Sequence, residues 1–223
     1  MNSSKVIAID GYASSGKSTL AKMLSRHYRI PFIDSGALYR GVTLFVLEKG
    51  FLKDNELDTK AFSSALNGLS LSIEPETGDL HLNGKNVSQK IRLPLVSDHV
   101  SIVASLSEVR NFLLHQQRQM AHECGLVMDG RDIGTVVFPN ADHKFFFTAR
   151  AEVRAKRRYQ ELKSQGQDTT LEKVWNNLTH RDQIDSSRKV APLRKADDAI
   201  EIDTSEVTTK QVFANLVEKI DAK

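Results

Sequence analysis

The amino-acid sequence predicts an α/β fold with a parallel β-sheet at its core. Short apolar runs typical of buried parallel strands recur along the 223-residue chain and alternate with segments of helical pattern. A glycine-rich loop follows the first run, and about 90 residues separate the second run from the third, which is too long for a simple crossover. We therefore expect a five-stranded parallel sheet with an inserted region. The expected strands are Val6–Ile9, Pro31–Ile33, Leu126–Met128, Phe145–Phe147 and Ile200–Ile202.

The composition is that of an ordinary globular protein. Hydrophobic residues make up 40% and charged residues 26% of the chain, close to the averages for folded proteins, so global disorder is excluded. Cys124 is the single cysteine, which excludes an intramolecular disulfide and a multi-cysteine zinc site. A chain with one cysteine is also typical of a reducing compartment, so we expect a cytoplasmic protein. No apolar run approaches the roughly 18 residues of a membrane span, and we expect neither a membrane segment nor a targeting segment.

Positive charge is concentrated in one part of the chain. The net charge of +3 is too small to indicate a nucleic-acid-binding protein by itself. Residues 150–195 hold twelve Lys or Arg against six Asp or Glu, so this segment carries +6 and the rest of the chain −3. Two interpretations remain open, a solvated helical surface with i,i+4 ion pairs or a cation-lined segment that binds phosphate groups.

The loop after the first predicted strand fits the phosphate-binding pattern G-x-x-x-x-G-K-[ST] at every fixed position. With a strand before it and a helical pattern after it, its backbone N–H groups and a helix N-terminus would face an anion. We expect Lys17 to reach the β- and γ-phosphates of a nucleoside triphosphate and Ser18 to bind Mg²⁺. The alternative is a glycine-rich turn with an exposed lysine. The predicted nucleotide contacts are Gly11, Tyr12, Ala13, Ser14, Ser15, Gly16, Lys17, Ser18 and Thr19.

The long stretch between the second and third strands predicts a small antiparallel sheet and then a helix. Leucine or isoleucine alternates with polar residues over 69–73 and 80–82, and the turn-forming pair Asn83-Gly84 follows. Ser105 and Glu108 have the spacing of a capping box, so we expect a helix to begin there. Its apolar face would consist of Val109, Phe112, Leu113 and Met120.

Polar residues follow the second and third predicted strands, at the sheet edge where ligands collect in open α/β folds. Asp34 and Ser35 follow the second strand, and they bind a ligand or cap the next helix. Asp129 closes the third strand in the position of a Mg²⁺-binding carboxylate, with helix capping as the alternative. Asp129 and Asp132 flank Arg131, an arrangement that is costly to bury unless ligands or partners satisfy it.

The basic segment predicts two helices. The first carries Arg154, Arg157 and Arg158 at helical spacing, and the second begins at Thr169 or Thr170 and runs through Leu178. The polar run 165–167 separates them.

Arginines in this segment suit phosphoryl transfer to a phosphate acceptor. Such an acceptor is already anionic, so the reaction needs alignment and charge neutralisation rather than a strong base. Arg181 and Arg188 stand seven residues apart with Asp185 between them and can share one face. The chain has no Asn-Lys-x-Asp guanine motif, which favours a small-molecule kinase over a GTPase.

Three segments together resemble the bacterial-type cytidylate kinases, a family of nucleoside monophosphate kinases. They are residues 34–40, residues 129–139 and the run from Arg181 to Leu193, and the resemblance covers essentially the whole chain. It implies that ATP, with Mg²⁺, donates its γ-phosphoryl group to CMP or dCMP. It also implies a P-loop core (1–34, 106–151 and 191–223), an enlarged NMP-binding region with the small antiparallel sheet (35–105) and a helical lid (152–190).

The resemblance further implies roles for individual residues. The implied catalytic residues are Lys17, Arg131, Arg181 and Arg188; Arg157 is a further ATP contact, and Ser18 and Asp129 hold Mg²⁺. The implied contacts to CMP or dCMP are Ser35, Arg40, Ser101, Arg110, Arg131, Asp132, Arg181, Asp185 and Arg188. Asp132 would accept a hydrogen bond from the cytosine N4 amino group, beside Ser101 and Arg110. Without the resemblance, Ser101 and Arg110 are better explained as parts of an ordinary polar helix face.

Some residues depart from the family pattern or fit it weakly. Tyr12 stands where the family more usually has proline, and Ser18 stands where several members have glycine or serine, but neither breaks the motif. The run 203–205 resembles a loop that supports adenine in related kinases, and a helix N-cap at Thr204 or Ser205 explains it about as well.

We expect CMP and dCMP as the partners, no nucleic-acid or membrane partner, and a monomer. A kinase for another small acceptor, such as shikimate, and a non-enzymatic nucleotide switch remain as alternatives.

Overall fold

The computed structural model describes residues 5–53, 56–74, 77–121 and 125–222, so Cys124 lies outside the described residues. The chain forms two compact units. One consists of Met1–Phe32 with Glu123–Lys223, and the other is Ile33–His122. Each unit has a hydrophobic core of its own. Within the described ranges, no helix is both long enough and apolar enough to cross a lipid bilayer.

The five-stranded parallel sheet is confirmed, and its strand order is β10-β9-β1-β8-β2. Its strands are β1 (Val6–Gly11), β2 (Phe32–Asp34), β8 (Leu126–Gly130), β9 (His143–Thr148) and β10 (Ile200–Asp203). The central strand β1 pairs with β8 on one side and β9 on the other, with Asp10 opposite Gly130 and Phe146. Because these strands are parallel, the loops that follow β1 and β8 leave the sheet side by side.

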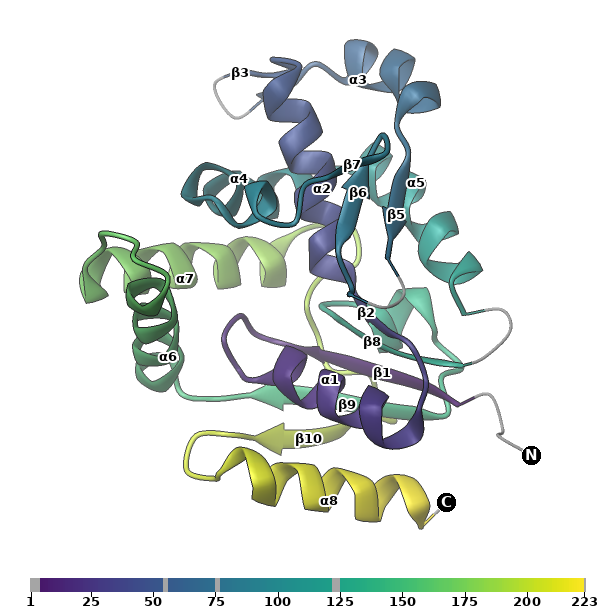
Figure 1. Ribbon diagram of the computed structural model, residues 1–223, viewed down its shortest axis with the longest axis vertical. Coiled ribbons are helices and arrows are strands. Elements are labelled where there is room, and N and C mark those ends of the chain that lie inside the picture. Colours follow the sequence, from purple (N-terminus) through teal and green to yellow (C-terminus); the bar gives the residue numbers. More distant parts are fainter. Residues whose placement is uncertain (1–4, 54–55, 75–76, 122–124, 223) are drawn as a thin grey trace. The chain divides into compact units, whose positions relative to one another are not determined.

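Helices α1 (Lys17–Tyr28) and α8 (Thr209–Asp221) pack against this sheet, and Figure 1 shows α8 in yellow alongside β10. Their apolar residues join Ile7, Ile9, Phe145 and Phe147 of the strands in one core cluster. Burial of this apolar surface is what holds the helices to the sheet. The α8 helix begins with a capping box formed by Thr208 and Gln211, so the alternative in which Thr204 or Ser205 is its N-cap is wrong.

The basic segment forms helices α6 (Ala151–Ser164) and α7 (Leu171–Ser187), which cross one another in Figure 1. The interruption between them is confirmed, since Gly166 has a positive φ of 74° that suits glycine. The Thr170 hydroxyl caps α7 by accepting a hydrogen bond from Lys173 N. The helix runs past Leu178 to Ser187, because Arg181 and Asp185 continue its buried face.

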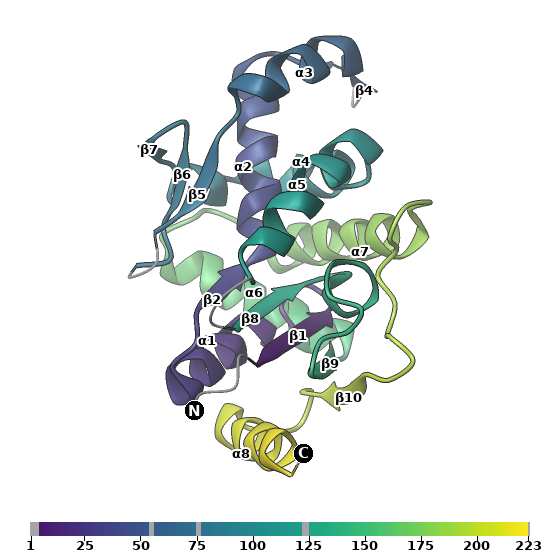
Figure 2. The ribbon, with the colours of Figure 1, turned by 90° about the vertical axis from the view of Figure 1, so that its right-hand side faces the viewer.

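The other unit is built around α2 (Ser35–Glu48), which lies between α4 (Pro94–Ala104) and the small sheet in Figures 1 and 2. The predicted antiparallel sheet is confirmed as β5 (Leu71–Ile73), β6 (Leu80–Leu82) and β7 (Lys85–Asn86). A Cβ at Gly41 of α2 would lie within 3 Å of Leu71 and Leu80 side chains, so glycine permits this close packing. The remaining elements are β3 (Leu52–Lys53), β4 (Glu56–Leu57), α3 (Thr59–Ala65), α5 (Ser107–Gln119) and 3₁₀ turns at Leu66–Gly68 and Lys90–Arg92.

The predicted capping box at Ser105 and Glu108 is wrong. Helix α5 begins at Ser107 with Leu106 as its N-cap, and no side chain caps it. The Ser105 hydroxyl instead donates to Ile102 O at the end of α4, because that preceding helix already engages it. The apolar face of α5 is as expected, with Val109 and Leu113 fully buried.

Candidate functional site

The glycine-rich loop joins β1 to α1 as the motif requires. Gly11 has a φ of 147°, and a Cβ there would lie 2.1 Å from Phe147 O of the neighbouring strand. Gly16 forms the N-cap of α1 with a φ of 89°. Only glycine suits both positions, and neither places a side chain between the loop backbone and an anion.

Lys17 lies at the first position of α1 and is buried. Its Nζ donates to Tyr12 O at 3.1 Å, and the Ser15 hydroxyl donates to the same carbonyl at 2.9 Å. These bonds fold the lysine back across the loop. The ammonium group is thus held beside the N–H groups that the motif directs at phosphate.

Ser18 and Asp129 lie together although 111 residues separate them. The Ser18 hydroxyl, in the first turn of α1, donates to Asp129 Oδ2 at the end of β8. Hydroxyl and carboxylate oxygens are the ligands that Mg²⁺ prefers, and Mg²⁺ usually takes few protein ligands and completes its shell with phosphate and water. The described residues include no group of three His, Cys, Asp or Glu side chains that would form a metal cage. The residue pair therefore fits a phosphate-bound Mg²⁺ ion, and the helix-capping alternative for Asp129 is not what the structure shows.

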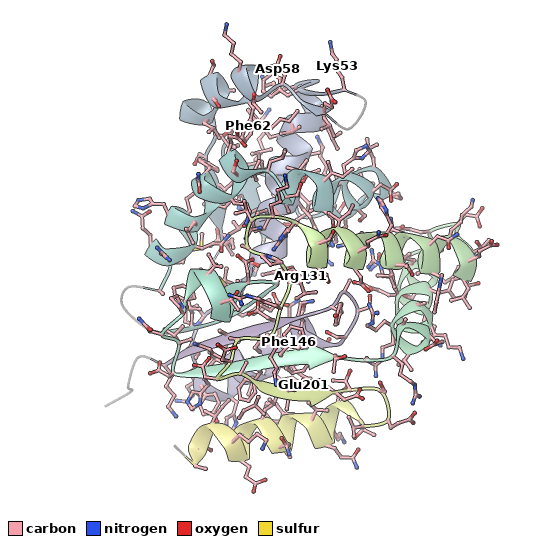
Figure 3. The ribbon with its side chains drawn as sticks, turned by 180° about the vertical axis from the view of Figure 1, so that it is seen from behind. Lys53, Asp58, Phe62, Arg131, Phe146 and Glu201 are labelled. Carbon is pink, nitrogen blue, oxygen red and sulfur yellow. The ribbon has the colours of Figure 1, made fainter. Side chains whose placement is uncertain are left out.

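The loop after β8 and helix α7 together form a buried cluster of opposite charges. Arg131 Nε donates to Asp185 Oδ2 at 2.8 Å, and Figure 3 shows Arg131 beside α7. Arg188, at the end of α7, has one guanidinium nitrogen 3.5 Å from Asp132 Oδ1 and another 3.9 Å from Asp185 Oδ1. Arg181 lies on the same buried face of α7. The structure thus brings together four predicted site residues, which are Arg131, Asp132, Asp185 and Arg188. The fifth, Arg181, lies on the same helix as Asp185.

Charge pairing overrides burial in this cluster. Burial alone would raise the pKa of Asp185, but Arg131, Arg181 and Arg188 lower it below its ordinary value. Burial alone would lower the pKa of Arg131, but Asp185 raises it. The carboxylate and the guanidinium groups are therefore charged together, and their attraction keeps the arginines oriented.

Asp10 is a residue that the sequence interpretation missed. Its carboxylate oxygens accept hydrogen bonds from Ile133 N and Gly134 N, each at 2.7 Å. Burial raises the pKa of Asp10 to about 7, although the two N–H donors and Lys17 act in the opposite direction. The available signal was an acidic residue at the end of an otherwise apolar buried strand, where an unpaired carboxylate is costly.

The three predicted arginines of α6, Arg154, Arg157 and Arg158, have different contacts. Arg157 donates to Thr204 Oγ1 at 3.0 Å and to Thr204 O at 2.6 Å, and the Thr204 hydroxyl in turn donates to Ser15 O at 2.8 Å. Arg157 is thereby connected to the phosphate loop through one residue. Arg158 forms a partly exposed ion pair with Glu161 on its own helix.

Arg154, which was predicted only as part of a lid face, contacts the phosphate loop directly. Its guanidinium lies 5.1 Å from the Tyr12 ring centre, within cation–π range, and donates to Ala13 O at 3.4 Å. It also pairs with Asp182 of α7 at 2.6 Å. Tyr12 therefore packs under an arginine where the resembling family more usually has proline.

Of the four residues predicted in the unit 33–122 to contact the acceptor nucleotide, three are buried and Arg40 is partly buried. Arg40 donates to the Ser97 hydroxyl at 3.1 Å, which links α2 to α4. Arg110 donates to Ala104 O at 3.0 Å and lies 5.3 Å from the Tyr39 ring centre. The remaining two predicted residues, Ser35 and Ser101, are buried on α2 and α4. Asp34 caps α2 by accepting from Ala37 N, so the capping interpretation holds for that residue.

Comparison with known proteins identifies the family. Residues 7–222 match the family model described as cytidylate kinase. The chain is 50% identical over 220 residues to a cytidylate kinase of Phocaeicola vulgatus, covering 97% of this chain and 96% of that protein. It is 48% identical over 206 residues to a cytidylate kinase of Bacteroides fragilis, covering 91% and 90% of the two chains.

A solved structure shares the fold at low sequence identity. An uncharacterised protein from Eubacterium ventriosum superimposes with a TM-score of 0.55 at 14% identity, covering 98% of this chain and 99% of that chain. The α/β fold, the motif-bearing loop and the match over nearly the whole sequence agree, and this chain belongs to the cytidylate kinase family.

Proposed function

We propose that this protein transfers the γ-phosphoryl group of MgATP to CMP or dCMP, giving ADP and CDP or dCDP. The observation that carries the proposal is the buried cluster of Arg131, Asp132, Asp185 and Arg188. Arg131 and Asp132 of this cluster follow β8, whose neighbour β1 leads into the phosphate loop. Membership of the cytidylate kinase family supports the choice of substrates.

On the donor side, the loop from Gly11 to Thr19 binds the ATP phosphates through its backbone N–H groups. Lys17 releases Tyr12 O and turns to the β- and γ-phosphates, neutralising charge as the phosphoryl group moves. Ser18 and Asp129 would hold Mg²⁺, directly or through water, and the ion would neutralise negative charge on the phosphates. Arg157 contacts ATP from α6, next to the loop that Thr204 secures.

On the acceptor side, the CMP phosphate is already a nucleophile, so no side chain needs to remove a proton from it. Arg131, Arg181 and Arg188 align that phosphate and stabilise charge that spreads over the transferring group. Asp185 keeps these arginines oriented and contacts the nucleotide sugar. Ser35 and Arg40 contact the acceptor nucleotide, and Arg40 binds its phosphate.

Cytosine is selected by hydrogen bonding at its edge. Asp132 accepts from the N4 amino group, while Ser101 and Arg110 donate to the acceptor atoms of the base. Uracil carries a carbonyl oxygen in place of that amino group and would face the carboxylate with an acceptor, which is unfavourable. The proposal therefore predicts a preference for CMP and dCMP over UMP.

We also propose that residues 35–105 form the NMP-binding region and 152–190 the lid, around a P-loop core of 1–34, 106–151 and 191–223. Closure of the lid would exclude water that otherwise hydrolyses ATP. We propose in addition that the protein is cytoplasmic and acts as a monomer. Light scattering of the purified protein with and without nucleotides tests the oligomeric state.

The proposed function is tested by ADP production from MgATP with CMP, dCMP, UMP, AMP or shikimate added separately. A large stimulation by CMP and dCMP supports both the reaction and the base contacts. Equal stimulation by UMP or AMP would retain a kinase but reject the cytosine contacts. Stimulation by shikimate alone would identify another small-molecule kinase, and tight ATP binding without any stimulated turnover would favour a nucleotide switch.

A further inference from the structure

The loop that carries Arg131 and Asp132 continues directly into a π-helical turn, Ile133–Val137. Within the turn, Val137 N donates to Asp132 O and Phe138 N donates to Ile133 O. The N–H groups at the start of any helical turn have no partner inside it. Here the first two of them, from Ile133 and Gly134, donate to Asp10, which lies 123 and 124 residues earlier in the chain.

Asp10 provides both acceptors from a rigid position. It is the residue of β1 that precedes Gly11 and is only 4% exposed, in the central strand of the sheet. A carboxylate offers one oxygen to each N–H, which a neutral amide of the same shape cannot do. A Cβ at Gly134 would lie 3.4 Å from Asp10 Oδ2 and 3.2 Å from Lys144 Cδ, so the turn packs closely against both side chains.

The other end of the same segment is held independently. Lys144 of β9 donates to Pro139 O at 2.5 Å and to Asp198 at 2.7 Å. Residues 133–139 are therefore secured to two adjacent strands, through Asp10 at the start and Lys144 at the end. The hydrogen bonds to Asp10 are the ones immediately next to Asp132.

We propose that Asp10 is a positioning residue for acceptor recognition, which fixes Arg131 and Asp132 by holding the N–H groups of Ile133 and Gly134. The proposal rests on the proposed function, because it assumes that Arg131 and Asp132 contact CMP. Asp10 itself does not touch substrate. Its removal impairs CMP binding and the choice of base, while ATP binding through the phosphate loop is retained.

The test is Asp10→Asn, compared with wild type and with Asp142→Asn. Asp142 is a matched control, because its exposed carboxylate also accepts a backbone hydrogen bond at 2.7 Å from β1, but from Val6 at the opposite end of the strand. Steady-state kinetics at pH 8, where the carboxyl of Asp10 is mostly ionised, give the KM and kcat for each of CMP, UMP and ATP. Circular dichroism and thermal unfolding monitor the fold of each variant.

We expect Asp10→Asn to raise the KM for CMP about tenfold or more and to reduce the CMP-to-UMP preference by a similar factor, as the loss of a charged hydrogen bond predicts. The KM for ATP should remain within about twofold of wild type. Asp142→Asn should match wild type in the KM for CMP, the CMP-to-UMP preference and the KM for ATP. A uniform loss with all nucleotides, or an unchanged CMP preference, overturns the proposal.

A second variant covers the case in which Asp10→Asn does not fold. Gly134→Ala keeps the carboxylate but places a methyl group 3.4 Å from Asp10 Oδ2 and 3.2 Å from Lys144 Cδ, beside the same hydrogen bonds. We expect the same selective rise in the KM for CMP, and an unaltered KM rejects the proposal. If wild type itself does not phosphorylate CMP, the proposed function fails and this inference fails with it; an active wild type with unaffected variants rejects Asp10 positioning alone.

Discussion

Arg131 Nε donates a hydrogen bond to Asp185 Oδ2 at 2.8 Å and so joins the loop after β8 to helix α7. Only 17% of the Arg131 side chain and 5% of the Asp185 side chain are exposed. Desolvating two charges in this way is costly, and the pair is favourable only because further groups complete it. Arg188 completes it by lying near both Asp185 and Asp132.

Replacing Asp185 by alanine should destabilise the fold. Arg131, Arg181 and Arg188 would lose their shared counter-charge, and breaking a buried pair costs about 3 kcal/mol. Urea unfolding at pH 7.5 measures the change. Glu48→Gln, which breaks the exposed pair with Lys90, is the control and should cost less than about 1 kcal/mol. Similar losses for both variants would contradict the importance of the buried cluster.

Lys17→Ala should reduce kcat for CMP phosphorylation by about 100-fold or more, as expected when a preorganised cation is removed from a developing charge. ADP production measures it. Lys22→Ala is the matched control, since Lys22 lies on the same helix, is exposed and stacks over Phe32. Retention of most activity in Lys17→Ala would reject the proposed role of the phosphate loop.

Asp132→Ala should weaken discrimination between CMP and UMP by about tenfold, because one hydrogen bond to the cytosine amino group is worth about 1.4 kcal/mol. The ratio of kcat/KM for the two nucleotides measures this effect. Asp197→Ala, an exposed aspartate of the same unit, is the control. A variant at position 132 that keeps the wild-type preference would refute the base contact.

Gly11→Ala should impair ATP binding and stability together. The new methyl group would lie 2.1 Å from Phe147 O, so either the loop or β9 must shift. We expect the KM for ATP to rise about tenfold, as a displaced set of phosphate-binding N–H groups implies. Gly68→Ala serves as the control because nothing lies within 4 Å of its Cβ position. Equal ATP affinity in the two variants would argue against the strained approach of the loop to β9.

Asp10 should make stability depend on pH between about 4 and 7. Burial raises the pKa of Asp10 from 3.8 to about 7, with Asp132 raising it further and Lys17 lowering it. In this range the folded protein holds a proton that the unfolded chain has released. The contribution of Asp10 to stability is therefore full below pH 4 and falls by about 1.4 kcal/mol per pH unit up to pH 7.

The measurement is the free energy of unfolding of wild type and Asp10→Asn at pH 5, 6, 7 and 8. Groups common to both proteins cancel in the difference, which should shrink as the pH rises to 7 and then become constant. Asp142→Asn, which removes an exposed carboxylate that accepts a hydrogen bond from the other end of β1, is the control. Parallel curves for wild type and Asp10→Asn would show that the carboxyl of Asp10 titrates normally.

Local patterns predicted the elements that depend on neighbouring residues. The five core strands, the phosphate loop and the cap of α7 at Thr170 each follow from the periodicity or spacing of a few adjacent positions. The errors were also local. Ser105 has the residue type and spacing of an N-cap, but the end of the preceding helix engages its hydroxyl.

Contacts between residues far apart in the chain could not be predicted from local patterns. Several site residues were predicted only through the family resemblance. Arg131, Asp132, Asp185 and Arg188 were predicted as site residues, and their pairing became visible only in the fold. Asp10 was overlooked because one acidic residue after an apolar run resembles the end of a strand. The strands, the phosphate loop and the family follow from the amino-acid sequence alone. The order of the strands decided which loops emerge side by side, and hence that Asp10 meets Gly134 and Ser18 meets Asp129. Secondary structure depends on nearest neighbours along the chain, whereas a buried charge is paired by groups that the sheet brings beside it from distant parts of the chain.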